Sequence, residues 1–313
     1  MSARPIILDC DPGQDDAVAI LLALASPTEL RLLGVTCVAG NAPVGQTQRN
    51  ARIVAELAGR PDLSVFAGCA GPVLRPLETA EMVHGRTGMD GHDLPEPVMP
   101  LQDRHAVDFI VDTCLSAQDG EITLVATGPM TNLAVAIVKE RRIVPRLREI
   151  VFMGGAAAHH GNSTPLTEFN VLTDPHAAQV VVGCGAPVTM LGLDVTHRLI
   201  TTPERLAAIR AIGTPVAHAV ADLLVFNDRF DIARYGLPGG PLHDPVTIGW
   251  LLRPDLFGGR DCHVAVETAS PLTGGVTVVD WWGFGGGPAN VHVVTEVDPQ
   301  GFYDLMTARL ERL

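Results

Sequence analysis

The sequence predicts an α/β fold, namely a single domain whose mostly parallel, doubly wound (Rossmann-like) central sheet is flanked by helices. We expect a binding site at the C-terminal ends of the strands. Three observations support this prediction. Short β-branched runs alternate with longer helical patterns along most of the chain. No linker or internal repeat divides the 313 residues, so one domain covering 1–313 is expected. Polar residues directly follow several of the expected strands.

The first part of the chain supplies strands separated by helices. Strands are expected at residues 5–8, 30–39, 63–67 and 121–126, and helices at 17–24, 42–57 and 106–117. A long stretch rich in glycine, proline and charge, residues 68–103, interrupts this alternation. Loops of such length are functional or disordered.

The second part continues the alternation and then becomes richer in strands. Expected strands are 148–153, 187–193, 262–268, 275–280 and 290–296, and expected helices are 175–182, one starting near 203, 215–235, 246–251 and 299–312. Asp174 precedes Pro175 as a helix N-cap. The glycine-rich residues 283–288 lack the Lys-Ser/Thr of a phosphate loop, so a hairpin connection is expected there.

Composition excludes several classes of protein. The net charge is -13, with 22 basic and 35 acidic residues, which argues against a nucleic-acid-binding surface. The start of the chain has no signal-peptide pattern, and no apolar run reaches the roughly 20 residues that span a bilayer. The six cysteines have no metal-binding spacing, and most of them sit in apolar surroundings. We therefore expect a cytoplasmic protein with reduced, buried thiols and no membrane partner.

The segment 9–16 concentrates negative charge between an expected buried strand and an expected buried helix. Its carboxylates belong to Asp9, Asp11, Asp15 and Asp16. Helix capping accounts for one or two of them. The others repel one another, and the segment contains no lysine or arginine, so a bound cation is expected to neutralise them. An all-oxygen site suits Ca²⁺ or Mg²⁺.

Other candidates have ordinary structural alternatives when judged from the residues alone. Asn41 follows a strand but suits a turn or cap, and His84 lies among glycines in a loop that could be solvated. Glu168 and Asn170 share a face if the chain is extended, although a surface loop would place them equally well. His243 and Asp244 precede a helix that Asp244 could cap.

Several of these segments resemble the inosine-uridine-preferring nucleoside hydrolases, enzymes that cleave the N-glycosidic bond of ribonucleosides with a Ca²⁺ ion. The resemblance covers essentially the whole chain. It rests on Ile-Leu-Asp-Cys-Asp-Pro-Gly-Gln-Asp-Asp-Ala at 7–17, Val-Ala-Gly-Asn at 38–41, His-Gly-x-x-Gly-Met-Asp-Gly at 84–91, Ala-Thr-Gly-Pro-x-Thr-Asn-Leu-Ala at 126–134, Glu-Phe-Asn at 168–170 and Pro-Leu-His-Asp-Pro at 241–245.

The resemblance implies a role for each matching residue. Ca²⁺ would be held by Asp11, Asp16, Asp244 and the Thr127 carbonyl. Asp11 would be the base that activates water, and His243 the acid that protonates the leaving base. The implied substrate-binding residues are Asp15, Asn41, His84, Met153, Glu168, Phe169 and Asn170. Family members are commonly homotetramers or homodimers, so a homo-oligomer is expected.

The nucleobase contacts are the least constrained part of this interpretation. Asp231 and Tyr235 lie four residues apart on an expected helix and share a face, which would serve base contacts or an ordinary helix surface equally well. We expect specificity for pyrimidine nucleosides or broad specificity.

Two other functions stay open at this point. Asp9-Cys10-Asp11 after a strand is similar to the start of haloacid-dehalogenase-like phosphatases, although Gly13 stands where those enzymes have Thr or Val. A ribonucleoside-binding protein without turnover is the second alternative. Release of base, release of phosphate, or neither would separate the three.

Overall fold

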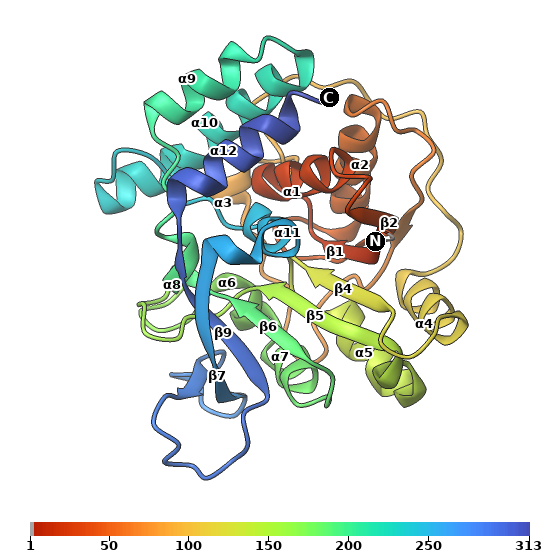
Figure 1. Cartoon of the computed structure of the whole chain (residues 1–313), viewed down its shortest axis with the longest axis vertical. Coiled ribbons are helices and arrows are strands. Elements are labelled where there is room, and N and C mark those ends of the chain that lie inside the picture. The colour runs from red at the N-terminus through yellow and green to blue at the C-terminus, as the bar shows by residue number, and fades with distance from the viewer. Residues whose placement is uncertain (1–2) are drawn as a thin grey trace.

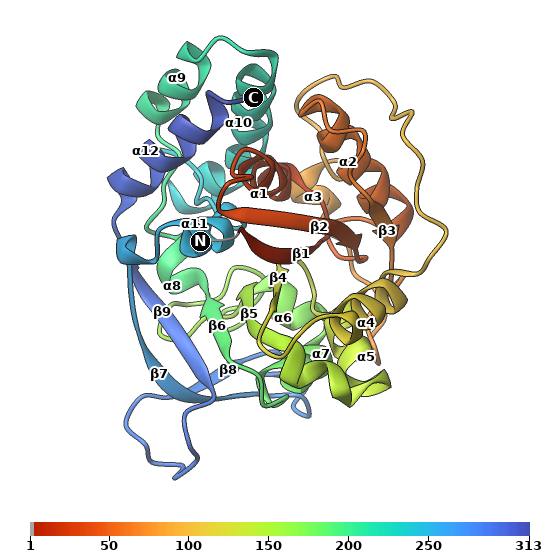
Figure 2. The ribbon, with the colours of Figure 1, turned by 45° about the vertical axis from the view of Figure 1, so that its right-hand side comes forward.

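The protein is described here by a computed structural model, which covers residues 3–313. Met1 and Ser2, part of the start considered for a signal peptide, lie outside the described residues. A central sheet runs through the molecule and is covered by helices on both faces (Figure 1). Figure 2 shows the sheet from the side of β2 and β3, with the strands β7, β8 and β9 at its far end.

The sheet has nine strands in the order β3-β2-β1-β4-β5-β6-β9-β7-β8. Their bounds are β1 Arg4–Cys10, β2 Leu30–Cys37, β3 Val65–Ala67, β4 Ile122–Ala126, β5 Leu147–Met153, β6 Val188–Leu191, β7 Phe257–Val266, β8 Thr277–Asp280 and β9 Val291–Val297. The helices are α1 Gln14–Leu24, α2 Val44–Leu57, α3 Glu81–His84, α4 Ala106–Ser116, α5 Thr131–Lys139, α6 Phe169–Thr173, α7 Pro175–Val182, α8 Leu193–Thr196, α9 Pro203–Ala211, α10 Pro215–Tyr235, α11 Pro245–Leu252 and α12 Pro299–Leu310, with the 3-10 turns η1 Arg141–Arg146 and η2 Pro254–Leu256.

The strand order confirms the predicted doubly wound, mostly parallel sheet. From β1 the chain moves outward through β2 and β3, then returns to the other side of β1 with β4 and continues through β5 and β6. Among the strand pairs within residues 3–313, β9–β7 and β7–β8 alone are antiparallel. The direction of winding therefore reverses between β1 and β4, the place where open α/β sheets bind ligands.

Two hydrophobic cores lie on the two faces of the sheet. Ile6 and Leu8 of β1 belong to one core and Ile7 to the other, because successive strand residues point to opposite faces. Helix α1 packs against α2, α10, α11 and α12 in the first core, while α4, α5 and α7 cover the other face (Figure 1). Every residue of α1 is buried, as expected for a helix that is apolar on most sides.

Three local expectations were wrong. The strand expected at 187–193 ends at Leu191, and the short helix α8 begins at Leu193. The strand expected at 262–268 begins at Phe257, because Phe257–Cys262 pairs with β9. Residues 283–288 do not form a hairpin connection, since β7 lies between β8 and β9 in the sheet.

The long segment 68–103 contains the helical turn α3 and a bridge between Phe66 and Gln102, so it is less irregular than expected. All six cysteines are free thiols, and five of them are buried. Within residues 3–313, no helix combines the length and apolar character needed to cross a membrane.

Candidate active site

The predicted site residues gather at the C-terminal edge of the parallel strands. Asp11 follows β1, Asn41 follows β2, Thr127 follows β4, and Met153 ends β5. A cavity of about 660 Å³ opens over this edge. The predicted residues that line it are Asp15, Asn41, His84, Thr127, Met153, Glu168, Phe169, Asn170, Asp231, His243 and Asp244.

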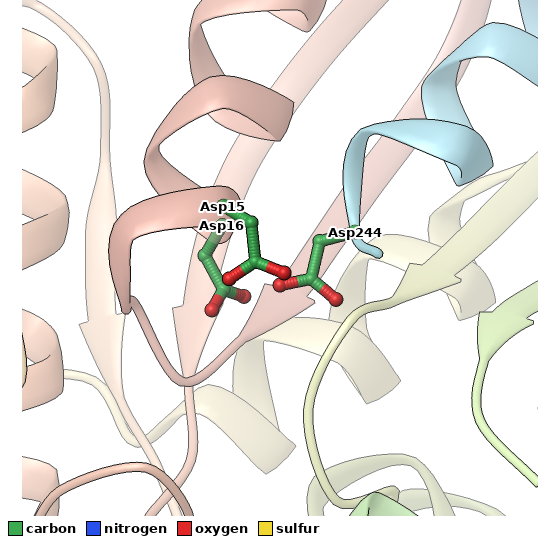
Figure 3. A group of neighbouring side chains, drawn as sticks. All are labelled: Asp15, Asp16 and Asp244. Atoms are coloured by element: carbon green, nitrogen blue, oxygen red, sulfur yellow. The ribbon is translucent and has the colours of Figure 1, made fainter. Parts of the chain in front are cut away.

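Three carboxylates converge beside this cavity, which Asp15 and Asp244 line and Asp16 does not. One oxygen from each of Asp15, Asp16 and Asp244 lies within 4.8 Å of the other two. The first two begin α1 and the third precedes α11, and the carboxylates of this acidic cluster point toward one another (Figure 3). The two helices pack together, which brings residues far apart in the sequence into one site.

The hydrogen bonds at the starts of α1 and α11 decide which carboxylates remain free to bind a cation. Asp16 accepts a hydrogen bond from Gly13 N at 3.0 Å and so closes the start of α1. Capping of α11 was one of the two roles left open for Asp244, but its side chain makes no capping hydrogen bond and its backbone is already helical (φ -65°, ψ -38°). The Asp244 carboxylate is therefore free to face Asp15 and Asp16.

Asp11, a predicted metal ligand, is fully buried, does not line the cavity and is not part of the acidic cluster, which contains Asp15 instead. The Oδ2 atom of Asp11 accepts a hydrogen bond from Asn41 N at 2.6 Å, whereas its Oδ1 is buried without a partner. Gly40 and Gly128 pack closely against this carboxylate: a Cβ on either would fall 2.1 Å and 2.3 Å from its oxygens. Asp9, in contrast, is bound by neighbouring elements: its Oδ1 accepts hydrogen bonds from Thr36 of β2 and Asn132 of α5.

Burial and mutual repulsion disfavour the ionised form of these acids. Burial, reinforced by Asp16, raises the pKa of Asp11, and burial with the neighbouring Asp15 raises the pKa of Asp16 to about 6. Burial and the same neighbour also raise the pKa of Asp244. An orphaned oxygen on Asp11 and a set of oxygen donors that repel one another fit a hard divalent cation.

Glu168 and Asn170 reach the cavity in a different way from the expected one. The chain there is not extended, since Glu168 is the N-cap of α6 and accepts hydrogen bonds from the Asn170, Val171 and Gly155 N–H groups. Asn170 Nδ2 donates to the Thr127 carbonyl at 2.8 Å. The side-chain amide of Asn41 donates to Asp16 Oδ2 at 3.3 Å. These two amides therefore orient oxygen atoms around the acidic cluster, namely the Thr127 carbonyl oxygen and a carboxylate oxygen of Asp16.

His84 is only 8% exposed, so the solvated-loop alternative is wrong. Its Nδ1 lies 2.6 Å from Gln14 Oε1, and Gln14 Nε2 donates to the carbonyls of His84 and Asp90. Burial lowers the pKa of His84 to about 4, which keeps the ring neutral at pH 7. Gln14 was not among the predicted site residues; its place within the aspartate-rich segment is the one sequence feature that draws attention to it, and nothing in that segment indicates its contact with His84.

Asp231 and Tyr235 do not have equivalent positions. Asp231 lines the cavity, whereas Tyr235 does not and lies beside the rings of His160 and His197. Asn162, from the polar loop after β5, also lines the cavity and accepts a hydrogen bond from Phe169 N, and it was not anticipated. A polar loop gives no periodic signal that would have identified it.

Comparison with known proteins identifies the family of the chain. The family described as inosine-uridine preferring nucleoside hydrolase matches residues 6–304. An uncharacterized protein of Schizosaccharomyces pombe is 49% identical over 308 residues, covering 98% of this chain and 99% of its own. A pyrimidine-specific ribonucleoside hydrolase of Shewanella sp. strain MR-7 is 47% identical over 309 residues, covering 98% and 96%.

A solved structure shows the same fold along the whole chain. A purine-preferring ribonucleoside hydrolase from Gardnerella vaginalis superposes with a TM-score of 0.92 and 33% sequence identity over 98% of each chain. The chain therefore belongs to the inosine-uridine preferring nucleoside hydrolase family.

Proposed function

We propose that the protein hydrolyses the N-glycosidic bond of ribonucleosides to ribose and a free nucleobase, that it requires Ca²⁺, and that it prefers pyrimidine nucleosides. One observation carries the proposal. The buried acidic cluster and a set of polar side chains meet at the floor of a single cavity, where the direction of sheet winding reverses.

The cation would be held by Asp11, Asp16, Asp244 and the Thr127 carbonyl. The unpartnered Oδ1 of Asp11 and the raised pKa values around it support this ligand set. A carbonyl oxygen has two lone pairs, so Thr127 can keep its hydrogen bond from Asn170 and still offer a ligand. When bound, Ca²⁺ would lower the pKa of the attacking water and hold ribose hydroxyls in place.

The chemistry then assigns the other side chains. As water attacks C1′, Asp11 takes its proton, and the electron pair of the C1′–N bond leaves with the base. The departing base receives a proton from His243. The surrounding carboxylates, among them Asp15 and Glu168, stabilise the positive charge that develops on the ribose. The same two carboxylates accept hydrogen bonds from ribose hydroxyls. The side-chain amides of Asn41 and Asn170 bind ribose hydroxyls as well.

Preference for pyrimidines rests on the comparison of relatives. The pyrimidine-specific Shewanella protein is 47% identical to this chain, and the purine-preferring Gardnerella protein is 33% identical. Asp231 lines the cavity together with Asn227 and Arg234 of the same helix, and we assign Asp231 to the base because His243 lies near its carboxylate. We also expect a homodimer or homotetramer, which light scattering after size exclusion would test.

Base and ribose release from uridine, cytidine, inosine, adenosine and thymidine tests the proposal, with and without a chelator. We expect release from the pyrimidine ribonucleosides to be fastest, to stop on chelation and to return with Ca²⁺. Thymidine lacks the 2′ hydroxyl and should be a poor substrate, since unpaired polar groups in the site reject it. Release that survives chelation would refute the metal requirement, and binding without release would favour the non-catalytic alternative.

A further inference from the structure

His243, the acid that we assign to the leaving base, contacts Thr196, a residue that lies outside the sequence motifs. His243 lines the cavity, and its Nδ1 lies 2.9 Å from the hydroxyl of Thr196. Thr196 is fully buried at the last position of α8. One of the two ring nitrogens of His243 is therefore already engaged by the protein, and only Nε2 is left for a ligand.

Backbone pairing fixes the two residues relative to each other. Residues 199–201 run beside 240–242, with Leu242 N donating to Leu199 O at 2.9 Å and Thr201 N to Gly240 O at 2.8 Å. This pairing places the loop before α11 against the chain that leaves α8. His243 is thus delivered to Thr196 by main-chain hydrogen bonds that do not depend on either side chain.

Helix α8 is itself anchored to the core of the site. Leu193 N donates to Gly155 O at 2.9 Å, just beyond the end of β5. The carboxylate of Asp194 accepts hydrogen bonds from the backbone N–H groups of residues 157–159. The His197 ring packs 5.7 Å from the ring of His243, centroid to centroid. These contacts hold α8 in place, and they therefore fix the position of the Thr196 hydroxyl.

We propose that Thr196 is a positioning residue that orients the His243 imidazole and reserves Nε2 for proton transfer to the leaving base, an inference that rests on the proposed function. A hydroxyl oxygen can accept the Nδ1–H bond from both the charged and the neutral ring. The proton that the ring gives up is then the one on Nε2, and Nδ1 keeps its own. As the C1′–N bond breaks, its electron pair and this proton both go to the base.

Isosteric variants test the role of the hydroxyl. Thr196→Val removes the oxygen and keeps the shape, whereas Thr196→Ser keeps the oxygen. Thr123→Val is the matched control, because Thr123 is fully buried on β4 and its hydroxyl has no hydrogen-bond partner. We would measure kcat and KM on uridine and on p-nitrophenyl riboside, whose leaving group needs no proton.

We expect Thr196→Val to lower kcat on uridine by about tenfold or more, since general acid catalysis contributes about 10²–10⁴-fold. We expect KM on uridine, and both constants on p-nitrophenyl riboside, to change little. Thr196→Ser and Thr123→Val should resemble the parent enzyme. In a His243→Ala background, Thr196→Val should cause no further loss on uridine, an outcome that general damage to the fold would not produce.

The inference fails if Thr196→Val slows both substrates equally, if it has no effect on uridine, or if its effect persists without His243. Those results require a parent enzyme that cleaves uridine, so they leave the proposed function standing. A parent enzyme that releases base from no ribonucleoside would instead overturn both proposals.

Discussion

The glycines around Asp11 lead to a sharp prediction for Gly128→Ala. A Cβ at this position would lie 2.3 Å from Asp11 Oδ1 and 2.8 Å from its carboxyl carbon. Favourable contacts between heavy atoms lie near 3.5 Å, so the carboxylate must move by about 1 Å. Gly128 is not among the glycines with positive φ, so alanine suits its backbone. The substitution displaces the proposed base and metal ligand without removing a polar group.

A misplacement of about 1 Å can cost about 10²-fold in rate, so we expect kcat/KM on uridine to fall by about that factor, or about 2.7 kcal/mol. We also expect weaker Ca²⁺ binding by titration calorimetry. Gly45→Ala on α2 is the matched control, because no atom lies within 4 Å of its added Cβ. Gly128→Ala with the rate and the Ca²⁺ affinity of Gly45→Ala would refute the view that Asp11 acts from its present position.

Three further predictions concern other parts of the site and the fold. His243→Ala should slow uridine cleavage while sparing p-nitrophenyl riboside, and equal losses in steady-state assays would remove its role as acid. Asp244→Asn keeps the shape but removes a buried charge, so Ca²⁺ should raise the unfolding temperature of this variant less than that of the parent; an unchanged calcium shift in scanning calorimetry would exclude Asp244 as a ligand. Burial raises the pKa of Asp228 from 3.8 to about 7; the nearby Gly240 N–H offsets only part of this rise, and it makes no hydrogen bond of normal geometry to either oxygen. Between about pH 4 and pH 7 the Asp228 carboxyl keeps its proton in the folded state and loses it in the unfolded state. The contribution of Asp228 to the free energy of unfolding therefore falls as pH rises through that window, by up to about 4 kcal/mol. Urea unfolding of Asp228→Asn should show a smaller loss between about pH 5 and pH 8 than the parent, and parallel curves would contradict the assignment.

The local part of the fold could be predicted from the sequence because local patterns determine it. The apolar runs on both sides of the aspartate-rich segment identified β1 and α1, and the bounds of α10 matched the expected 215–235. The order of the last strands could not be predicted this way. The insertion of β9 between β6 and β7 depends on pairing between distant segments, which periodicity does not report.

In the site, too, local features could be predicted from the sequence, whereas contacts between distant segments could not. The Asp11 to Asp16 segment could be identified as charged and buried from its own neighbours, whereas only the family resemblance placed Asp244 beside it. The periodicity of α10 gave the spacing of Asp231 and Tyr235 but not which of them faces the cavity. Contacts such as Gln14 with His84 arise from loop packing between elements, and no spacing rule anticipates them.

The origin of the acidic cluster has a consequence for assembly of the chain. Its carboxylates come from residues 15, 16 and 244, so the site is incomplete until the last quarter of the polypeptide has been synthesised and α11 has docked on α1. A cation held there would join the first helix of the chain to a helix more than 200 residues later in the sequence. Its binding free energy would then stabilise the whole molecule, by about 2.7 kcal/mol at a free concentration one hundred times the dissociation constant. The supply of that cation during synthesis would therefore influence the yield of folded protein as well as its activity.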